Sequence, residues 1–310
     1  MLTINNLAFS WQEKPVLEDI SFSMASNEII ALLGPNGSGK TTLIRCILGQ
    51  LKPSAGSVTA AYDAPSTAER SSPLTSWVPQ KITCYPLLTV RQNLTEFARI
   101  MRIPRAGIAT RVDEVLALIG LQHRADDQAK NLSGGMQRML NVGIGLVSKP
   151  DVLLIDEPTA GIDQEAHERL YQVLDTLKAS GLSILMTTHD LEDVSRLATR
   201  VLVLADGRLR ADGTVGELIL QRFADKREVN LELLGSEADY AAVETELEGL
   251  GLEHTGDGTW AGLVSMQGTE LRRLYDIIDA HEPLVGRFRQ QKPDMERFIR
   301  SMLEERGSAE

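Results

Sequence analysis

The feature that most constrains the fold is a glycine-rich loop between a short apolar strand and a helix. Ile29–Leu33 reads as a buried strand, and Thr41–Leu51 carries apolar residues at the spacing of one helix face. Between them lies the run Gly34-Pro35-Asn36-Gly37-Ser38-Gly39-Lys40-Thr41-Thr42, which matches the pattern Gly-x4-Gly-Lys-Thr. Such a loop presents backbone N–H groups and a lysine to phosphates, and its hydroxyl binds Mg²⁺. The alternative interpretation is an ordinary glycine-rich turn.

A second apolar strand, Val152–Ile155, ends in two carboxylates, Asp156 and Glu157. Continuous apolar runs are typical of buried parallel strands, and ligands bind at the carboxyl ends of such strands. We expect Asp156 to hold Mg²⁺ and Glu157, which points differently along the strand, to polarise an attacking water. The alternative is a salt-bridging acidic pair at the end of a strand.

A second candidate phosphate cradle occurs at Leu132-Ser133-Gly134-Gly135-Met136-Gln137. A serine and two glycines before a helix present a hydroxyl, uncovered N–H groups and a helix dipole to an anion. Two cradles with one set of catalytic carboxylates suggest a nucleotide that is shared between two copies of the chain.

The order of predicted elements divides the chain into two domains. Strands alternate with helices over residues 1–220, which predicts an α/β fold with parallel strands, and residues 90–146 form a helical subdomain within it. From 225 to 310 the order becomes strand, helix, two strands, helix and strand. This is the ferredoxin-like order of a small α+β domain, and a further helix ends the chain.

The net charge of −11 comes from one stretch. Residues 228–282 hold 13 Asp or Glu against 2 Arg, and the remainder carries 30 acidic and 30 basic residues. An acidic patch repels nucleic acid, so no nucleic-acid partner is expected, although a solvated acidic face is the simpler interpretation. The apolar runs have four or five residues where a membrane span needs about 20. Two cysteines without Cys-x-x-Cys spacing fit a reduced, cytoplasmic location.

Over residues 1–220 these motifs together resemble the ATP-binding-cassette (ABC) ATPases, a family with a P-loop NTPase core. The pieces occur in the order of the family: Gly34–Thr42, Gln80, Leu132–Met136, Val152–Glu157, Gly161-Ile162-Asp163 and His189. The resemblance implies ATP and Mg²⁺ as cofactors and ATP hydrolysis as the activity.

The resemblance also assigns roles to single residues. It implies that Ser133 and Gly135 contact the γ-phosphate of ATP in the opposite subunit, that Asp163 links the two sites, and that Trp11 stacks on adenine. Taken alone, Gln80 could be a surface residue, His189 a structural histidine and Trp11 a core aromatic. Their roles are therefore supported by where they stand among the other motifs. The implied catalytic residues are Glu157, His189, Gln80 and Lys40, and the implied metal ligands are Thr41, Gln80 and Asp156. The implied nucleotide-binding residues are Trp11, Gly34, Pro35, Asn36, Gly37, Ser38, Gly39, Lys40, Thr41, Thr42, Ser133, Gly134, Gly135 and Asp163.

Two further similarities point to transport. Tyr85–Leu94 resembles the segment by which transporter cassettes receive a membrane subunit, and Met136 in the glycine-rich motif resembles ABC-2 exporters. The implied function is the ATPase subunit of an exporter: a homodimer around two ATP·Mg²⁺, peripheral on the cytoplasmic face through an integral membrane transporter subunit.

Three alternatives remain. One is a soluble cassette that acts in macromolecular assembly or remodelling rather than transport. Another is a nucleotide-dependent regulatory module, which requires a defective site, although Lys40, Asp156, Glu157 and His189 are all present. Residues 225–310 have two possible interpretations: a module that extends the homodimer interface, or a regulatory, ligand-sensing domain.

Overall fold

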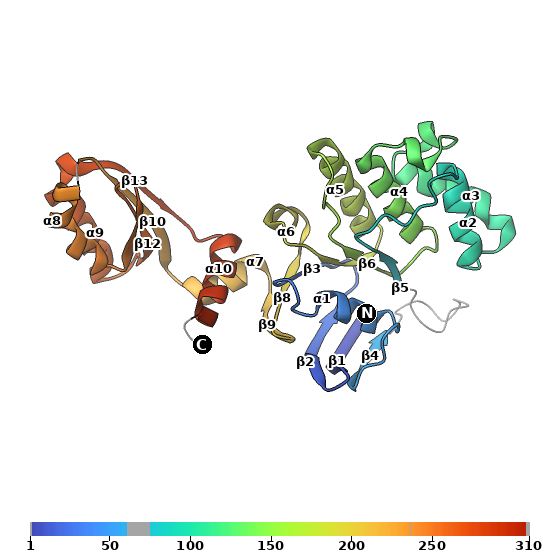
Figure 1. Ribbon diagram of the computed structural model, residues 1–310, viewed down its shortest axis with the longest axis horizontal. Helices are drawn as coiled ribbons and strands as arrows, with labels where there is room; N and C mark the ends of the chain where they lie inside the picture. The colour runs from blue at the N-terminus through green and yellow to red at the C-terminus, as the bar shows by residue number, and fades with distance from the viewer. Residues whose placement is uncertain (1, 61–74, 236, 308–310) are drawn as a thin grey trace. The chain divides into compact units, whose positions relative to one another are not determined.

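The computed structural model describes residues 2–60, 75–235 and 237–307. The chain divides into two compact units, Met1–Thr214 and Val215–Glu310, whose elements are labelled in Figure 1. The first unit contains two sheets and the second contains one, and each unit has its own buried apolar cluster.

The centre of the first unit is a six-stranded sheet in the order β5-β6-β7-β3-β8-β9. Neighbouring strands are parallel from β5 to β8, and only the β8–β9 pair is antiparallel. Every residue of β3 and β7 is buried, as their continuous apolar sequences predict. The α/β prediction is therefore confirmed. The strands are β3 (Ile29–Leu33), β5 (Thr75–Val78), β6 (Val152–Asp156), β7 (Ser183–Thr187), β8 (Arg200–Ala205) and β9 (Arg208–Gly213).

A second, antiparallel sheet in the order β2-β1-β4 packs on the first through helix α1 (Lys40–Ile47). Leu43, Ile44 and Ile47 of α1 belong to one buried cluster with alternating residues of both sheets. This packing fixes the start of α1 directly behind β3. The strands of the second sheet are β1 (Leu2–Trp11), β2 (Lys14–Met24) and β4 (Ala55–Ala60).

Helices α2 (Val90–Ile100), α3 (Arg105–Leu118) and α4 (Gly134–Leu146) form a helical subdomain beside the strand β5 (Figure 1). Thr89 begins α2 with a capping box, since its hydroxyl accepts from the Gln92 N–H and Gln92 bonds back to Thr89. Ten residues of α4 are buried, because the helix packs against α2, α3, β5 and the helix α5 (Gln164–Ala179). Short 3-10 turns at Gln122–Arg124 and Ala129–Asn131 connect α3 to α4.

Two further helices complete the first unit. Helix α5 (Gln164–Ala179) follows β6, and α6 (Leu191–Leu197) follows β7. Each begins with an aspartate, Asp163 or Asp190, whose carboxylate accepts a hydrogen bond from the first turn.

The second unit contains a four-stranded antiparallel sheet in the order β11-β12-β10-β13. Its core is formed by strand residues such as Leu231 and Trp260 together with Leu274 and Ile277 of α9. Strand order and helix order match the predicted ferredoxin-like arrangement. The elements are α7 (Val215–Phe223), β10 (Lys226–Leu233), α8 (Glu237–Glu248), β11 (Leu252–Gly256), β12 (Thr259–Ser265), α9 (Thr269–Ala280), a 3-10 turn (Glu282–Leu284), β13 (Val285–Gln291) and α10 (Met295–Gly307).

The second unit begins at Val215, somewhat before the boundary that the sequence suggested, because α7 packs with α10. The Arg222 Nε donates to the Ser301 hydroxyl at 3.1 Å and ties the two helices together.

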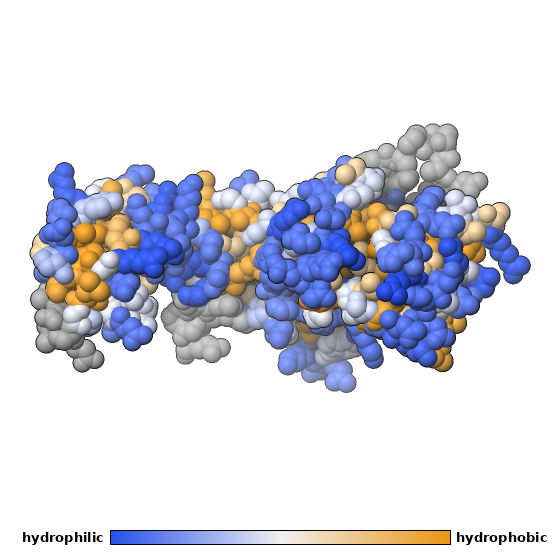
Figure 2. All heavy atoms as spheres, turned by 90° about the horizontal axis from the view of Figure 1, so that it is seen from above, coloured by the Kyte–Doolittle hydropathy of each residue, from blue (hydrophilic) through white to orange (hydrophobic). Residues whose placement is uncertain are grey.

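No helix within the described residues is both long enough and apolar enough to cross a lipid bilayer. On the face drawn in Figure 2, hydrophilic side chains predominate and apolar ones form smaller patches between them.

Candidate functional site

Four neighbouring parallel strands deliver the predicted site to one edge of the sheet. Strands β5, β6, β7 and β3 run in the same direction, so their carboxyl ends lie side by side. Gln80 follows β5, Asp156 and Glu157 end β6, His189 follows β7, and the glycine-rich loop 34–42 follows β3. Segments from four distant parts of the sequence are thereby brought together.

The loop between β3 and α1 is shaped to receive an anion. Gly39 is the N-cap of α1 and offers no side-chain acceptor, so the first-turn N–H groups have no cap from their own chain. Gly34 has φ 153° and lies so close to β8 that an added Cβ would be 2.1 Å from the Leu204 carbonyl oxygen. The Ser38 hydroxyl is buried without a hydrogen-bond partner. An orphaned hydroxyl beside uncapped N–H groups fits a bound phosphate.

Lys40 lies inside this loop, near the carboxylates of β6. Its Nζ donates to the carbonyl oxygens of Gly34 at 2.7 Å and Pro35 at 3.0 Å. Burial lowers the pKa of Lys40, while the Glu157 and Asp156 carboxylates oppose that effect. A partly desolvated ammonium gains from an added anion, which is the property that phosphate binding requires.

The carboxylates at the end of β6 are each held by a residue from a neighbouring strand. The Thr187 hydroxyl donates to Asp156 Oδ1 at 2.5 Å, and the Gln80 amide nitrogen donates to Glu157 Oε2 at 2.5 Å. His189 Nδ1 lies 3.2 Å from Glu157 Oε1. The structure therefore brings Gln80, Glu157 and His189 into one hydrogen-bonded group.

The residues available for a metal are few. Within the part of the chain that the structure describes, three or more His, Cys, Asp or Glu never gather as a metal cluster. Mg²⁺ in nucleotide sites takes one or two protein ligands besides phosphates and water, so a sparse set fits it. Asp156 offers its second carboxylate oxygen, Thr41 its hydroxyl, and Gln80 the amide oxygen that its bond to Glu157 leaves available.

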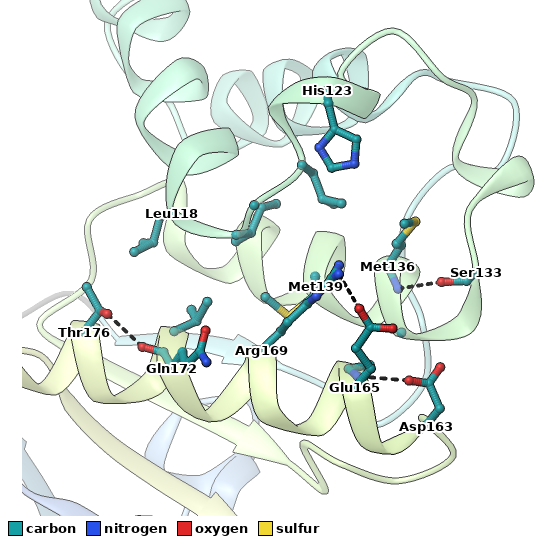
Figure 3. Close-up of a pocket in the computed structure, with 16 residues that line it drawn as sticks. Leu118, His123, Ser133, Met136, Met139, Asp163, Glu165, Arg169, Gln172 and Thr176 are labelled. Atoms are coloured by element: carbon teal, nitrogen blue, oxygen red, sulfur yellow. Dashed lines mark hydrogen bonds and ion pairs between the residues drawn. The ribbon is translucent and has the colours of Figure 1, made fainter.

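The second predicted cradle is built from the starts of α4 and α5 (Figure 3). Ser133 caps α4 by accepting from the Met136 N–H at 3.3 Å, and Asp163 caps α5 by accepting from the Ala166 N–H at 3.0 Å. A Cβ at Gly135 would lie 2.4 Å from the Ala166 Cβ, so only glycine allows the two helix starts to meet.

Ser133, Gly135, Met136 and Asp163 line one end of a pocket of about 550 Å³. The loop 34–42 contributes no lining residue to it, and among the described residues no hydrogen bond joins that loop to residues 133–135. Within one chain, the two predicted cradles are therefore separate.

Trp11 is the last residue of β1. Its side chain is 52% exposed and packs edge-on against Phe9, with ring centroids 5.0 Å apart. One face of the indole is thus open to stack with a planar ligand.

Sequence reasoning missed two buried polar residues that support the site. Arg138 in α4 is 2% exposed and donates only to backbone carbonyls. Asp193 in α6 is fully buried and accepts from the hydroxyls of Thr159, Tyr171 and Thr188. A charged residue on an otherwise apolar helix face was the available signal for Arg138. No sequence signal was available for Asp193, because its hydrogen-bond partners lie at separate positions along the chain.

The chain is similar to known proteins. The family model described as "ABC transporter" matches residues 17–160. The "Nod factor export ATP-binding protein I" of Ralstonia nicotianae is 39% identical over 220 residues, which cover 71% of this chain and 68% of the relative. The "Linearmycin resistance ATP-binding protein LnrL" of Bacillus subtilis is 34% identical over 219 residues, which cover 70% of each chain.

A solved dimeric ATP-binding cassette in a post-hydrolysis state with ADP and Pi is similar in structure. It has a TM-score of 0.58 and 25% identity, and the match covers 69% of this chain and 98% of that one.

Proposed function

Because the chain belongs to the ABC transporter family and is an ATPase subunit, we propose that two copies close around two ATP·Mg²⁺ and drive a separate membrane subunit that exports its cargo. The proposal of a dimer rests on the separation of the two cradles within one chain. Among the described residues, no hydrogen bond joins residues 34–42 to residues 133–135, and residues 34–42 do not line the pocket that Ser133 and Gly135 line. A second copy in a two-fold arrangement supplies each loop with its counterpart.

The residues of the first cradle have distinct tasks in hydrolysis. Loop 34–42 and Lys40 bind the phosphates, and Glu157 orients and polarises the attacking water, held in place by Gln80. Thr41, Asp156 and Gln80 would hold Mg²⁺, which when bound neutralises charge on the phosphate oxygens. His189, beside Glu157, is placed to contact the γ-phosphate.

A membrane partner is supported by an apolar surface next to the Gln80 segment. Tyr85, Leu87 and Ile100 are 48%, 69% and 62% exposed, and Tyr85, Leu87, Leu88 and Ile100 line a shallow pocket. Exposed apolar groups of this kind mark interaction sites. Because the Ralstonia relative is named for export, we assign this surface to the membrane subunit, which holds the chain on the cytoplasmic face of the membrane.

The dimer is tested with Glu157→Gln. This variant keeps the size of the side chain and loses the carboxylate, so ATP·Mg²⁺ is expected to trap a dimer with almost no turnover. Light scattering should then show about twice the mass of the 34.0 kDa chain only when ATP is present. Glu168→Gln, an exposed substitution on α5, is the control. A monomer with ATP, or turnover like that of the wild type, contradicts the proposal.

The transporter assignment is tested by co-purification from membranes. A polytopic membrane protein that binds the wild type and is lost with Leu87→Asp, while basal ATPase activity persists, supports it. If only water-soluble proteins bind in a Leu87-dependent way, the chain acts in assembly or remodelling instead.

For the second unit we propose a role in extending the homodimer. The relatives quoted match about 70% of the chain, so they assign no role to this unit. Arg287 and Arg289 of β13 are exposed and lie opposite Glu232 and Asn230 of β10, which gives one sheet both charge signs, as a self-pairing surface needs. Removal of residues 215–310 is expected to weaken the ATP-bound dimer. An unchanged dimer favours the ligand-sensing alternative.

A further inference from the structure

Arg138 is a cationic side chain buried in the middle of α4, without an acidic partner among the described residues. Its guanidinium donates five hydrogen bonds, and all of them go to backbone carbonyl oxygens. Burial lowers the pKa of Arg138 to about 10, while the Asp156 and Glu157 carboxylates oppose that effect, so the group is charged at neutral pH. Carbonyl dipoles therefore take the place of a counter-ion.

These five carbonyls come from the two segments that carry Gln80 and Glu157. Nη1 donates to Pro79 at 2.8 Å and to Gln80 at 3.0 Å. Nη2 donates to Asp156 and to Glu157, each at 2.7 Å, and Nε donates to Pro158 at 2.8 Å. One planar group thus fixes the spacing of the backbone segments whose side chains meet at the reacting carboxylate.

Glu157 has a backbone conformation that needs support. Its φ is 46°, in the left-handed region, which non-glycine residues rarely adopt. It also precedes Pro158, and a residue before proline is normally pushed toward an extended conformation. Such strain persists only where the surroundings enforce it. Thr187 holds the Glu157 N–H through its carbonyl oxygen and its hydroxyl, and Arg138 holds the Glu157 carbonyl.

We propose that Arg138 is a positioning residue for ATP hydrolysis, which holds Glu157 in its left-handed conformation and so directs the carboxylate to Gln80 and His189. Asn141, one turn further along α4, supports the same arrangement. Its amide donates to the Pro79 carbonyl at 3.0 Å and its oxygen accepts from the Thr83 N–H at 3.1 Å. Ser133 is the N-cap of α4, so this helix connects the second cradle to the Gln80 segment and to Glu157.

Arg138→Lys tests the kinetic consequence. Lysine keeps the charge but lacks the planar fork, so it cannot bond both segments at once. We expect kcat to fall by about tenfold or more, with the dissociation constant of ATP within about threefold of wild type, because none of the five hydrogen bonds of Arg138 goes to loop 34–42. A kcat within about twofold of wild type overturns the proposal.

The chain offers a matched control in Arg111 of the neighbouring helix α3. Arg111 donates from Nε to the Val147 carbonyl at 3.1 Å and from Nη2 to Leu146, at the far end of α4. Arg111→Lys loses the same kind of hydrogen bond away from Glu157, so kcat is expected to stay within about twofold of wild type. A loss equal to that of Arg138→Lys shows a general effect on α4 and overturns the positioning role.

A double-mutant cycle, measured as the stability of the fold, tests whether Arg138 supports the Glu157 backbone or only contributes to the core as a buried side chain. Glu157→Gly removes the backbone strain, because glycine adopts positive φ readily. The urea midpoint is therefore expected to fall less on Arg138→Lys in the Glu157→Gly background than in the wild-type background. If Arg138→Lys folds only together with Glu157→Gly, the proposal is equally supported. Additive changes, or failure to fold in both backgrounds, overturn it.

Discussion

The side-chain amide of Gln80 donates a hydrogen bond to the carboxylate of Glu157 at 2.5 Å, across 77 positions of sequence. The contact exists because β5 and β6 are parallel neighbours whose carboxyl ends meet. It places a neutral donor on the carboxylate to which we assign the polarisation of water, and the Gln80 segment continues directly into the apolar surface of Tyr85 and Leu87. Under the proposed function, we expect movement of that surface to reach the Glu157 carboxylate through this segment.

Removal of this contact is expected to slow chemistry without loss of nucleotide binding. In Gln80→Ala, Glu157 loses its donor and the metal loses a ligand, so kcat should fall by about tenfold to a hundredfold. ATP affinity measured without Mg²⁺ should be unchanged, because loop 34–42 is intact. Steady-state ATPase assays and nucleotide titrations check both quantities, with the exposed Gln290→Ala as control. A loss of affinity with normal kcat contradicts this assignment.

Thr187→Val isolates the hydroxyl that orients Asp156. Thr187 is fully buried, donates to Asp156 Oδ1 and accepts from the Glu157 N–H at 3.1 Å. Loss of the hydroxyl should reduce the free energy of unfolding by about 1–2 kcal/mol and raise the Mg²⁺ concentration for half-maximal ATPase activity severalfold. Urea denaturation and Mg²⁺ titration measure the two effects. Thr187→Ser keeps the hydroxyl and should behave like wild type in the Mg²⁺ titration.

The lowered pKa of Lys40 has a stability consequence with a definite sign. The protonated form is disfavoured in the folded protein, so the unfolded chain binds this proton more strongly. The resulting destabilisation is fully present below the folded-state pKa and disappears as pH rises toward the ordinary value of 10.5.

Lys40→Met tests this linkage in nucleotide-free protein. The Tm of the variant relative to wild type should be higher at neutral pH than at about pH 10.5, as differential scanning calorimetry can show. Lys292→Met, an exposed substitution, is the control. A Tm difference that is constant with pH speaks against the linkage. Addition of ATP should stabilise wild type and leave the Lys40→Met variant unchanged.

The buried carboxylate of Asp193 supports the segments around the site. It accepts from Thr188 at 2.7 Å and from Thr159 and Tyr171 at 2.8 Å each. Burial, with the bond to Asp193, raises the pKa of Tyr171 well above its ordinary value, so the phenol remains a donor. Asp193→Leu leaves the hydroxyls of Thr159 and Tyr171 without an acceptor and leaves that of Thr188 only the Asp190 carbonyl oxygen at 3.4 Å, so it should cost about 3 kcal/mol or more of unfolding free energy.

Tyr171→Phe removes one of these three bonds and should cost about 1 kcal/mol. Chemical denaturation of both variants measures the values. Equal losses for the two substitutions mean that the other two hydroxyls contribute nothing.

Local sequence patterns were sufficient for the elements and for the residues at strand ends. Continuous apolar runs identified β3 and β6, and helical spacing with a glycine-rich start identified α1. Once the strands are parallel, the position of Gln80, Glu157 and His189 on one edge follows from the rule for strand ends. The sequence by itself thus determined the fold class and the proximity of these groups.

Only the tertiary structure decided how the groups are held. The five carbonyl bonds of Arg138, the left-handed conformation of Glu157 and the three hydroxyls on Asp193 join residues that no periodicity relates. The same is true of Gly135, whose missing side chain is required by Ala166 of another helix. A periodic sequence pattern shows which face of a helix or strand is buried. The partner of a buried polar group depends on which distant backbone segment packs there, and this is fixed only when the elements assemble.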